Sequence, residues 1–140
     1  MQDTVGVIIP AYNEEARIGY TINGLKKIDC IDTILVIDDG SKDKTSEVAQ
    51  KAGVQVIRLN KNSGKGNALK IGLGAIQTPI IAFVDADIGE TAKEIEKLIL
   101  PVLKGYADVT IGKIPFVSGK GGFGIVKNFS RIALRWLTGT

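Results

Sequence analysis

Short runs of apolar, β-branched residues alternate with helix-like patterns along this chain of 140 residues. The strand-like runs lie at residues 5–10, 33–37, 54–59 and 79–84, and a fifth is expected at residues 107–111. Helical spacing predicts helices at residues 14–28, 43–52 and 68–76, and another that opens at Thr91. Apolar strands that are each followed by a helix indicate an α/β fold, with a mostly parallel sheet flanked by helices.

Each of the four main strand-like runs is followed by a cluster of polar residues. The clusters are Asn13-Glu14, Asp38-Asp39-Gly40-Ser41, Asn62-Ser63-Gly64-Lys65-Gly66 and Asp85-Ala86-Asp87. The carboxyl ends of parallel strands share one edge of a sheet, and such sheets bind their ligands there. We therefore expect the four clusters to form one site.

Composition excludes several classes of function. The chain has no histidine, which removes His-based acid–base catalysis, His-Cys zinc sites and Ser-His-Asp triads. Cys30 is the only cysteine, so no internal disulfide forms and a reducing, cytoplasmic environment is expected. A net charge of +3 is too small to predict nucleic-acid binding. No apolar run approaches the roughly 20 residues of a membrane span.

Asp85 and Asp87 stand two residues apart at the end of a strand, where side chains i and i+2 point the same way. Two carboxylates on one side repel each other unless a cation lies between them. Oxygen ligands without His or Cys favour Mg²⁺ or Mn²⁺, which also bind substrate phosphates. The alternative is a solvated turn that is acidic.

The cluster Asp38-Asp39-Gly40-Ser41 suits a nucleoside, because an Asp there can accept hydrogen bonds from a base N–H or a ribose hydroxyl. Simple capping of the following helix by Asp or by Ser41 is the alternative.

Residues 62–66 offer backbone N–H groups, a lysine and a helix N-terminus to an anion, or else form a flexible turn. The loop is not a Walker A loop, because Leu59 and Gly66 stand where Gly and Ser or Thr are needed. No Gly-x-Gly-x-x-Gly follows the first strand, which disfavours a dinucleotide fold.

The C-terminal part of the chain is basic, since residues 109–140 hold five Lys or Arg and no Asp or Glu. Residues 121–140 predict an amphipathic helix in which Lys127, Arg131 and Arg135 recur every four residues opposite an apolar arc. A basic helix with Phe129 and Trp136 on its apolar arc suits a membrane interface or an anionic lipid head group. The alternative is an ordinary helix that covers the sheet.

Taken together, four motifs resemble those of family 2 glycosyltransferases with the GT-A fold. They are Pro10-Ala11-Tyr12-Asn13-Glu14, Asp38-Asp39-Gly40-Ser41, Gly64-Lys65-Gly66-Asn67-Ala68-Leu69 and Asp85-Ala86-Asp87. The stretch at residues 121–139 further resembles dolichyl- or polyprenyl-phosphate sugar transferases. The resemblance implies the Rossmann-like nucleotide-binding half of a GT-A fold, with donor binding in residues 1–112 and the start of an acceptor region in residues 113–140. Because the family domain extends further, we expect the chain to be an N-terminal part of it.

The resemblance also implies roles for individual residues. The donor nucleotide would be bound by Pro10, Ala11, Tyr12, Glu14, Asp39, Gly40, Lys65, Asp85 and Ala86. Asp39 would hold the base or ribose, and Lys65 would lie near the base or the phosphates. Asp85 and Asp87 would bind Mg²⁺ or Mn²⁺, with Asp87 as the direct metal ligand and the catalytic residue. The cation would stabilise the charge that develops on the diphosphate leaving group.

The implied reaction is inverting transfer of a hexose from a UDP- or GDP-sugar to a polyprenyl (dolichyl or undecaprenyl) phosphate at the cytoplasmic membrane face. A lipid phosphate is already anionic at about pH 7, so it needs no carboxylate base but needs positive charge, which Lys127, Arg131 and Arg135 would supply. Without the remaining acceptor region the chain would be inactive by itself. Transfer to a soluble or polysaccharide acceptor and a non-catalytic nucleotide-sugar-binding module are the alternatives. A phospho-receiver domain would leave the lysine-containing loop unexplained.

Overall fold

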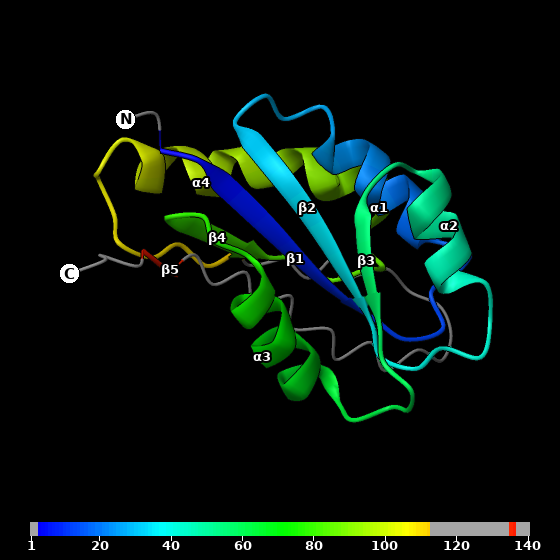
Figure 1. Cartoon of the computed structure of the whole chain (residues 1–140). Coiled ribbons are helices and arrows are strands. Elements are labelled where there is room, and N and C mark those ends of the chain that lie inside the picture. Colours follow the sequence, from blue (N-terminus) through cyan, green and yellow to red (C-terminus); the bar gives the residue numbers. More distant parts are fainter. Residues whose placement is uncertain (1–2, 113–134, 137–140) are drawn as a thin grey trace, which may run out of the picture.

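The computed structural model describes residues 3–112 and 135–136. In this part of the chain a five-stranded sheet has the order β3-β2-β1-β4-β5 (Figure 1). The strands β1 (Val5–Ala11), β2 (Ile31–Asp38), β3 (Gln55–Arg58) and β4 (Ile80–Phe83) are parallel. A short β5 (Arg135–Trp136) pairs antiparallel with β4. The predicted α/β fold with a mostly parallel sheet is confirmed.

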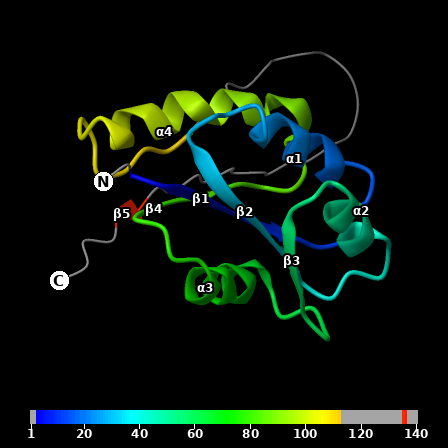
Figure 2. The same cartoon turned by 45° about the horizontal axis from the view of Figure 1, so that its top comes forward.

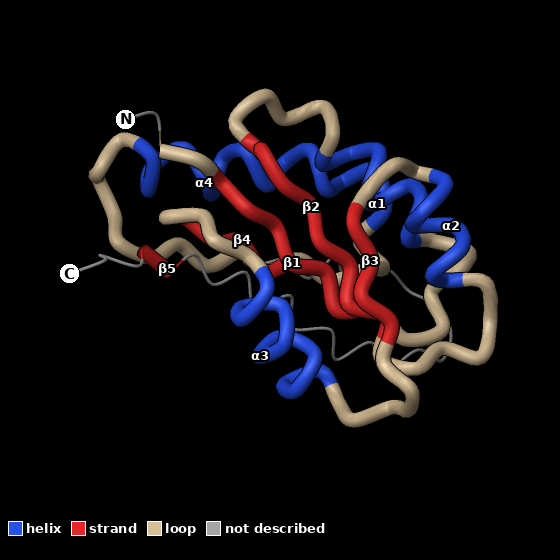
Figure 3. The backbone as a smooth tube through the Cα atoms, viewed as in Figure 1, coloured by secondary structure: helices blue, strands red, loops and turns tan. Residues whose placement is uncertain are grey.

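Helices cover both faces of this sheet. One face carries α1 (Ile18–Leu25), α2 (Thr45–Lys51), the 3₁₀ segment η1 (Gly89–Ile95) and α4 (Glu96–Leu103), which continues η1. The opposite face carries α3 (Lys65–Ala75) (Figure 2). Figure 3 shows the strands passing between these two helical layers. No helix within residues 3–112 has the length and apolarity that crossing a bilayer requires.

The alternation of side chains along β1 explains why helices can cover both faces. Val5, Val7 and Ile9 pack in the core formed with α1 and α4, whereas Ile8 packs in the core beneath α3. All four side chains are fully buried. A strand that is covered on both sides must be apolar throughout, which is the pattern seen in the sequence.

The strand predicted at residues 107–111 is wrong. The Thr110 hydroxyl donates a hydrogen bond of 2.7 Å to the Leu98 carbonyl, which ties this segment to α4, and the segment forms no strand. Val109 and Ile111 stay exposed there. The position next to β4 is taken by β5, whose antiparallel pairing satisfies backbone groups along the open edge of β4.

Of the basic helix predicted at residues 121–140, the structure describes only residues 135–136, and these two are not helical. Arg135 and Trp136 form the strand β5, because they pair with Ile81 and Ile80. The rest of that predicted helix, including Lys127 and Arg131, lies outside the described residues.

Candidate functional site

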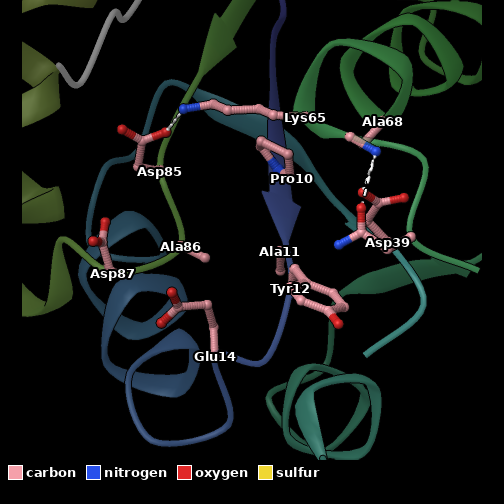
Figure 4. Close-up of a pocket in the computed structure, with 12 residues that line it drawn as sticks. Pro10, Ala11, Tyr12, Glu14, Asp39, Lys65, Ala68, Asp85, Ala86 and Asp87 are labelled. Carbon is pink, nitrogen blue, oxygen red and sulfur yellow. Dashed lines mark hydrogen bonds and ion pairs between the residues drawn. The ribbon is translucent and has the colours of Figure 1, made fainter. Parts of the chain in front are cut away.

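The carboxyl ends of β1, β2 and β4 and the first turn of α3 surround a cavity of about 520 Å³ (Figure 4). It is lined by Pro10, Ala11, Tyr12, Glu14, Asp39, Asn62, Gly64, Lys65, Ala68, Asp85, Ala86 and Asp87. Residues from all four polar clusters of the sequence therefore meet at one edge of the sheet. Of the residues expected to bind the nucleotide or the cation, Gly40 alone does not line this cavity and lies along a neighbouring one.

The loops after β1 and β2 are tied together by Asn13 and Ser41. The backbone N–H of Asn13 donates to the Ser41 hydroxyl at 2.9 Å, and the Asn13 side-chain carbonyl accepts from the Lys42 N–H at 2.8 Å. Asn13 has a φ of 53°, a left-handed conformation that Asn tolerates better than most residues. The alternative that Ser41 caps the next helix is wrong, because α2 begins at Thr45 without a side-chain cap and the Ser41 hydroxyl accepts from the Asn13 N–H.

Asp38 is fully buried and holds the turn that follows β2. Its carboxylate accepts from the Ser41 N–H at 2.8 Å and from the Ser46 hydroxyl. The Arg58 Nε lies 3.9 Å from the same carboxylate. Burial of a carboxylate requires such partners, so Asp38 stabilises the turn and does not reach the cavity.

Asp39 is 4 % exposed and anchors the loop that leads into α3. One carboxylate oxygen accepts from the Ser63 N–H at 2.8 Å and from the Ser63 hydroxyl at 3.0 Å. The other accepts from the Gly64 N–H at 2.8 Å. Lys65 follows Gly64 and is the first residue of α3, so Asp39 fixes where Lys65 enters the cavity. The oxygen that accepts from Gly64 keeps one lone pair for a ligand.

The acidic side of the cavity is formed by Asp85 and Asp87, which follow β4. Their side chains are only 15 % and 17 % exposed. Lys65 donates from its ammonium group to Asp85, and its side chain extends past Pro10 to reach it (Figure 4). The Arg17 Nη1 lies 3.8 Å from an Asp87 oxygen.

Arg17 is a site residue that the sequence analysis missed. Its Nε and Nη2 donate to the two carboxylate oxygens of Glu14 at 2.9 and 3.1 Å, and the same guanidinium faces Asp87. Burial raises the pKa of Glu14; Arg17 opposes the rise, and the nearby Asp87 adds to it. The spacing Glu14-x-x-Arg17 directly after a strand is the sequence signal that could have identified the pair, since residues i and i+3 of a helical turn are neighbours.

The residues after β4 fit a divalent cation in their chemistry. Asp85 and Asp87 offer carboxylate oxygens, the ligands that Mg²⁺ and Mn²⁺ prefer, and the Lys65 ammonium shows that a positive charge is accommodated there. Within the described residues, no group of three or more Asp, Glu or Cys could hold a metal by itself. A cation at this place would take its remaining ligands from a bound diphosphate and from water.

The start of α3 brings positive charge to the cavity. The α3 helix begins there at Lys65 after Gly64, whose φ of 96° turns the chain into the helix. The positive end of the helix dipole and the Lys65 side chain both favour an anion at this place. The cavity thus combines a cationic helix start and a carboxylate pair.

Comparison with known proteins agrees with this geometry. The profile of the family described as Glycosyl transferase family 2 matches residues 6–137. An uncharacterized protein of Methanocaldococcus jannaschii is 41 % identical over 138 residues, which cover 89 % of this chain and 56 % of that protein. Dolichyl-phosphate beta-glucosyltransferase of Mus musculus is 39 % identical over 121 residues, which cover 75 % of this chain and 36 % of that protein.

A solved structure supports the same relation. Glucosyl-3-phosphoglycerate synthase from Mycobacterium tuberculosis, in complex with Mn²⁺, UDP and glucosyl-3-phosphoglycerate, has a TM-score of 0.66 and 32 % identity. The match covers 72 % of this chain and 40 % of that one, and it confirms the GT-A type of fold. The chain spans 56 % and 36 % of the length of the two relatives above. Because the family profile covers nearly the whole sequence, the chain belongs to glycosyl transferase family 2.

Proposed function

We propose that the chain is the donor-binding part of an inverting glycosyltransferase that takes a hexose from a UDP- or GDP-sugar. The observation that carries the proposal is the single cavity in which Asp39, Lys65 and Asp87 converge from three separate elements. Its lining residues lie between Pro10 and Asp87, which supports assigning donor binding to residues 1–112. The related synthase was crystallised with UDP and Mn²⁺, which favours a UDP-sugar and a divalent cation here.

In the proposed complex each side of the cavity has one task. Tyr12 and Asp39 contact the nucleoside, and Lys65 at the start of α3 binds the diphosphate. Asp85 and Asp87 would hold a Mg²⁺ or Mn²⁺, which would supply the positive charge that a leaving diphosphate needs. Attack from the opposite side of the sugar gives inversion.

For the acceptor, we propose a polyprenyl phosphate at the cytoplasmic face of a membrane. The similarity to a dolichyl-phosphate beta-glucosyltransferase supports this acceptor, and Lys127, Arg131 and Arg135 would bind its phosphate. A soluble phosphorylated acid is the second candidate, favoured by the similarity to glucosyl-3-phosphoglycerate synthase. A polyprenyl phosphate attacks through an oxygen that is already anionic and needs no general base, whereas the hydroxyl of a phosphorylated acid must give its proton to one.

Thermal denaturation with UDP and with GDP, each with and without Mn²⁺, tests the donor site. We expect one nucleotide to raise the melting temperature and Mn²⁺ to increase the rise, because ligands that bind the folded state stabilise it. Asp87→Ala should abolish the Mn²⁺-dependent part. Asp29→Ala, an exposed change before β2, should leave it intact. The donor site is refuted if neither nucleotide shifts the transition.

Binding to lipid vesicles separates the two acceptors. Alanine at Lys127, Arg131 and Arg135 together should weaken binding to vesicles that contain a polyprenyl phosphate, since the interaction with anionic lipid is electrostatic. Unchanged vesicle binding would contradict the lipid acceptor. Saturable binding of 3-phosphoglycerate by the same chain would instead support the soluble one.

A further inference from the structure

Both carboxylates after β4 already have a cationic partner from the chain itself. Lys65 donates to Asp85, and the Arg17 guanidinium lies 3.8 Å from Asp87. The two cations come from different elements, the first turn of α3 and the turn before α1. Two carboxylates this close in sequence destabilise each other unless positive charge compensates them, and these side chains supply that charge.

The two cations differ in how firmly they are held. Arg17 forms two hydrogen bonds to Glu14, so its guanidinium stays in place whether or not it contacts Asp87. For Lys65 the structure shows one contact, to Asp85, and its side chain is 54 % exposed. A long, exposed lysine side chain exchanges partners at low cost. Lys65 is therefore the partner that an incoming ligand can displace.

We propose that Lys65 is an internal counter-cation of Asp85 and that it couples the binding of the divalent cation to the binding of the nucleoside diphosphate. A divalent cation that arrives alone must displace the Lys65 ammonium from Asp85, so it binds weakly. When the diphosphate is also present, Lys65 moves to its phosphate oxygens and leaves Asp85 to the cation. Each ligand then strengthens the binding of the other. This inference rests on the proposed function of the cavity.

Binding of Mn²⁺ without any nucleotide tests the displacement, with free Mn²⁺ followed by electron paramagnetic resonance. Lys65→Met removes the competing charge, and we expect it to tighten Mn²⁺ binding by at least about fivefold, the lower end of typical coupling factors. Lys70→Met removes an exposed charge from the same helix and should leave Mn²⁺ affinity unchanged. Lys65→Arg keeps the charge and should behave as the wild type.

Calorimetric titration of UDP with and without Mn²⁺ measures the coupling itself. In the wild type, Mn²⁺ should strengthen UDP binding, and this strengthening should fall at least about fivefold in Lys65→Met but not in Lys70→Met. Equal or weaker Mn²⁺ binding by Lys65→Met in the absence of nucleotide overturns the inference. A wild type that binds neither UDP nor GDP refutes the proposed function instead, and the Mn²⁺ measurement still decides the role of Lys65 toward Asp85.

Discussion

Two adjacent aspartates at the end of β2 hold different loops. Asp38 points into the protein and holds the Ser41 turn, whereas Asp39 faces the cavity and holds the loop at residues 62–64. Successive side chains of an extended chain point to opposite sides, which explains the division. The pair thus fixes two loops of the site before any ligand binds, and a preorganised site loses less entropy on binding.

Asp39→Ala should destabilise the protein by about 2 kcal/mol, because hydrogen bonds to a charged group are each worth more than neutral ones. The change leaves the Ser63 and Gly64 donors without their acceptor. Asp39→Asn keeps one carbonyl acceptor, so its loss of stability should be about half that of Asp39→Ala. Urea denaturation of the three proteins measures this order. Equal stability of the alanine variant and the wild type would show that the loop is held by other contacts.

At the scale of elements, the position of α3 depends on close contact with β1. A Cβ added at Gly72 would lie 2.5 Å from the Ile8 Cγ2, which is inside van der Waals contact. Glycine at this position allows α3 to approach the sheet closely. The helix start, and with it Lys65, is placed over the cavity by this packing.

Gly72→Ala should destabilise the protein by about 1–2 kcal/mol, since overpacking of a dense core forces shifts that outweigh the gain in helix propensity. Gly74→Ala in the same helix meets nothing within 4 Å and should stabilise by about 0.5–1 kcal/mol. Urea denaturation tests this pair, because the free energy of unfolding should fall in Gly72→Ala and rise in Gly74→Ala. Destabilisation by both would mean that helix geometry, and not the Ile8 contact, sets the requirement.

Asp43 ties the start of α2 to the loop after β1. It accepts from the Thr45 N–H at 3.0 Å, from the Thr45 hydroxyl and from the Glu15 N–H at 3.1 Å. Burial pushes the pKa of Asp43 upward, but these hydrogen bonds outweigh it and lower the pKa below the usual 3.8. A lowered pKa in the folded state stabilises the protein above the unfolded pKa, and this stabilisation is lost as pH falls through the folded pKa.

Asp43→Ala should therefore cost about 1 kcal/mol at neutral pH, the usual net contribution of a hydrogen bond in a protein. The difference from the wild type should narrow as pH falls below about 3.8. Urea denaturation from pH 7 down to the lowest pH at which both proteins fold gives the two curves. A difference that is constant over this range would assign the effect to packing and not to the charge.

At the scale of the whole molecule, the edge of the sheet where the site lies could be predicted, because parallel strands carry their polar ends to the same side. The spacing could place Arg17 beside Glu14, but it could not show that the Arg17 guanidinium also faces Asp87, which is far away in the chain. Nor could it show that Asp39 holds Ser63, a contact between residues far apart in the chain. The prediction of a strand at residues 107–111 is wrong for the same reason, because this segment forms a tertiary hydrogen bond to α4 that the sequence pattern does not show.

The two ends of the sheet should respond differently to a bound nucleotide. Hydrogen exchange with UDP and Mn²⁺ should slow in the loops around residues 10–17, 38–42, 61–67 and 84–88 together, because one ligand contacts all four and suppresses their local opening. The opposite end carries its own cavity, lined by residues such as Leu25, Asp32 and Gly53, and serves as the internal control. Exchange near residues 26–33 and 52–55 should stay unchanged. Protection of one loop alone would indicate an anion bound at the surface and not a nucleotide that spans the strand ends. Protection near residues 26–33 and 52–55 would show that the ligand binds at the other end of the sheet.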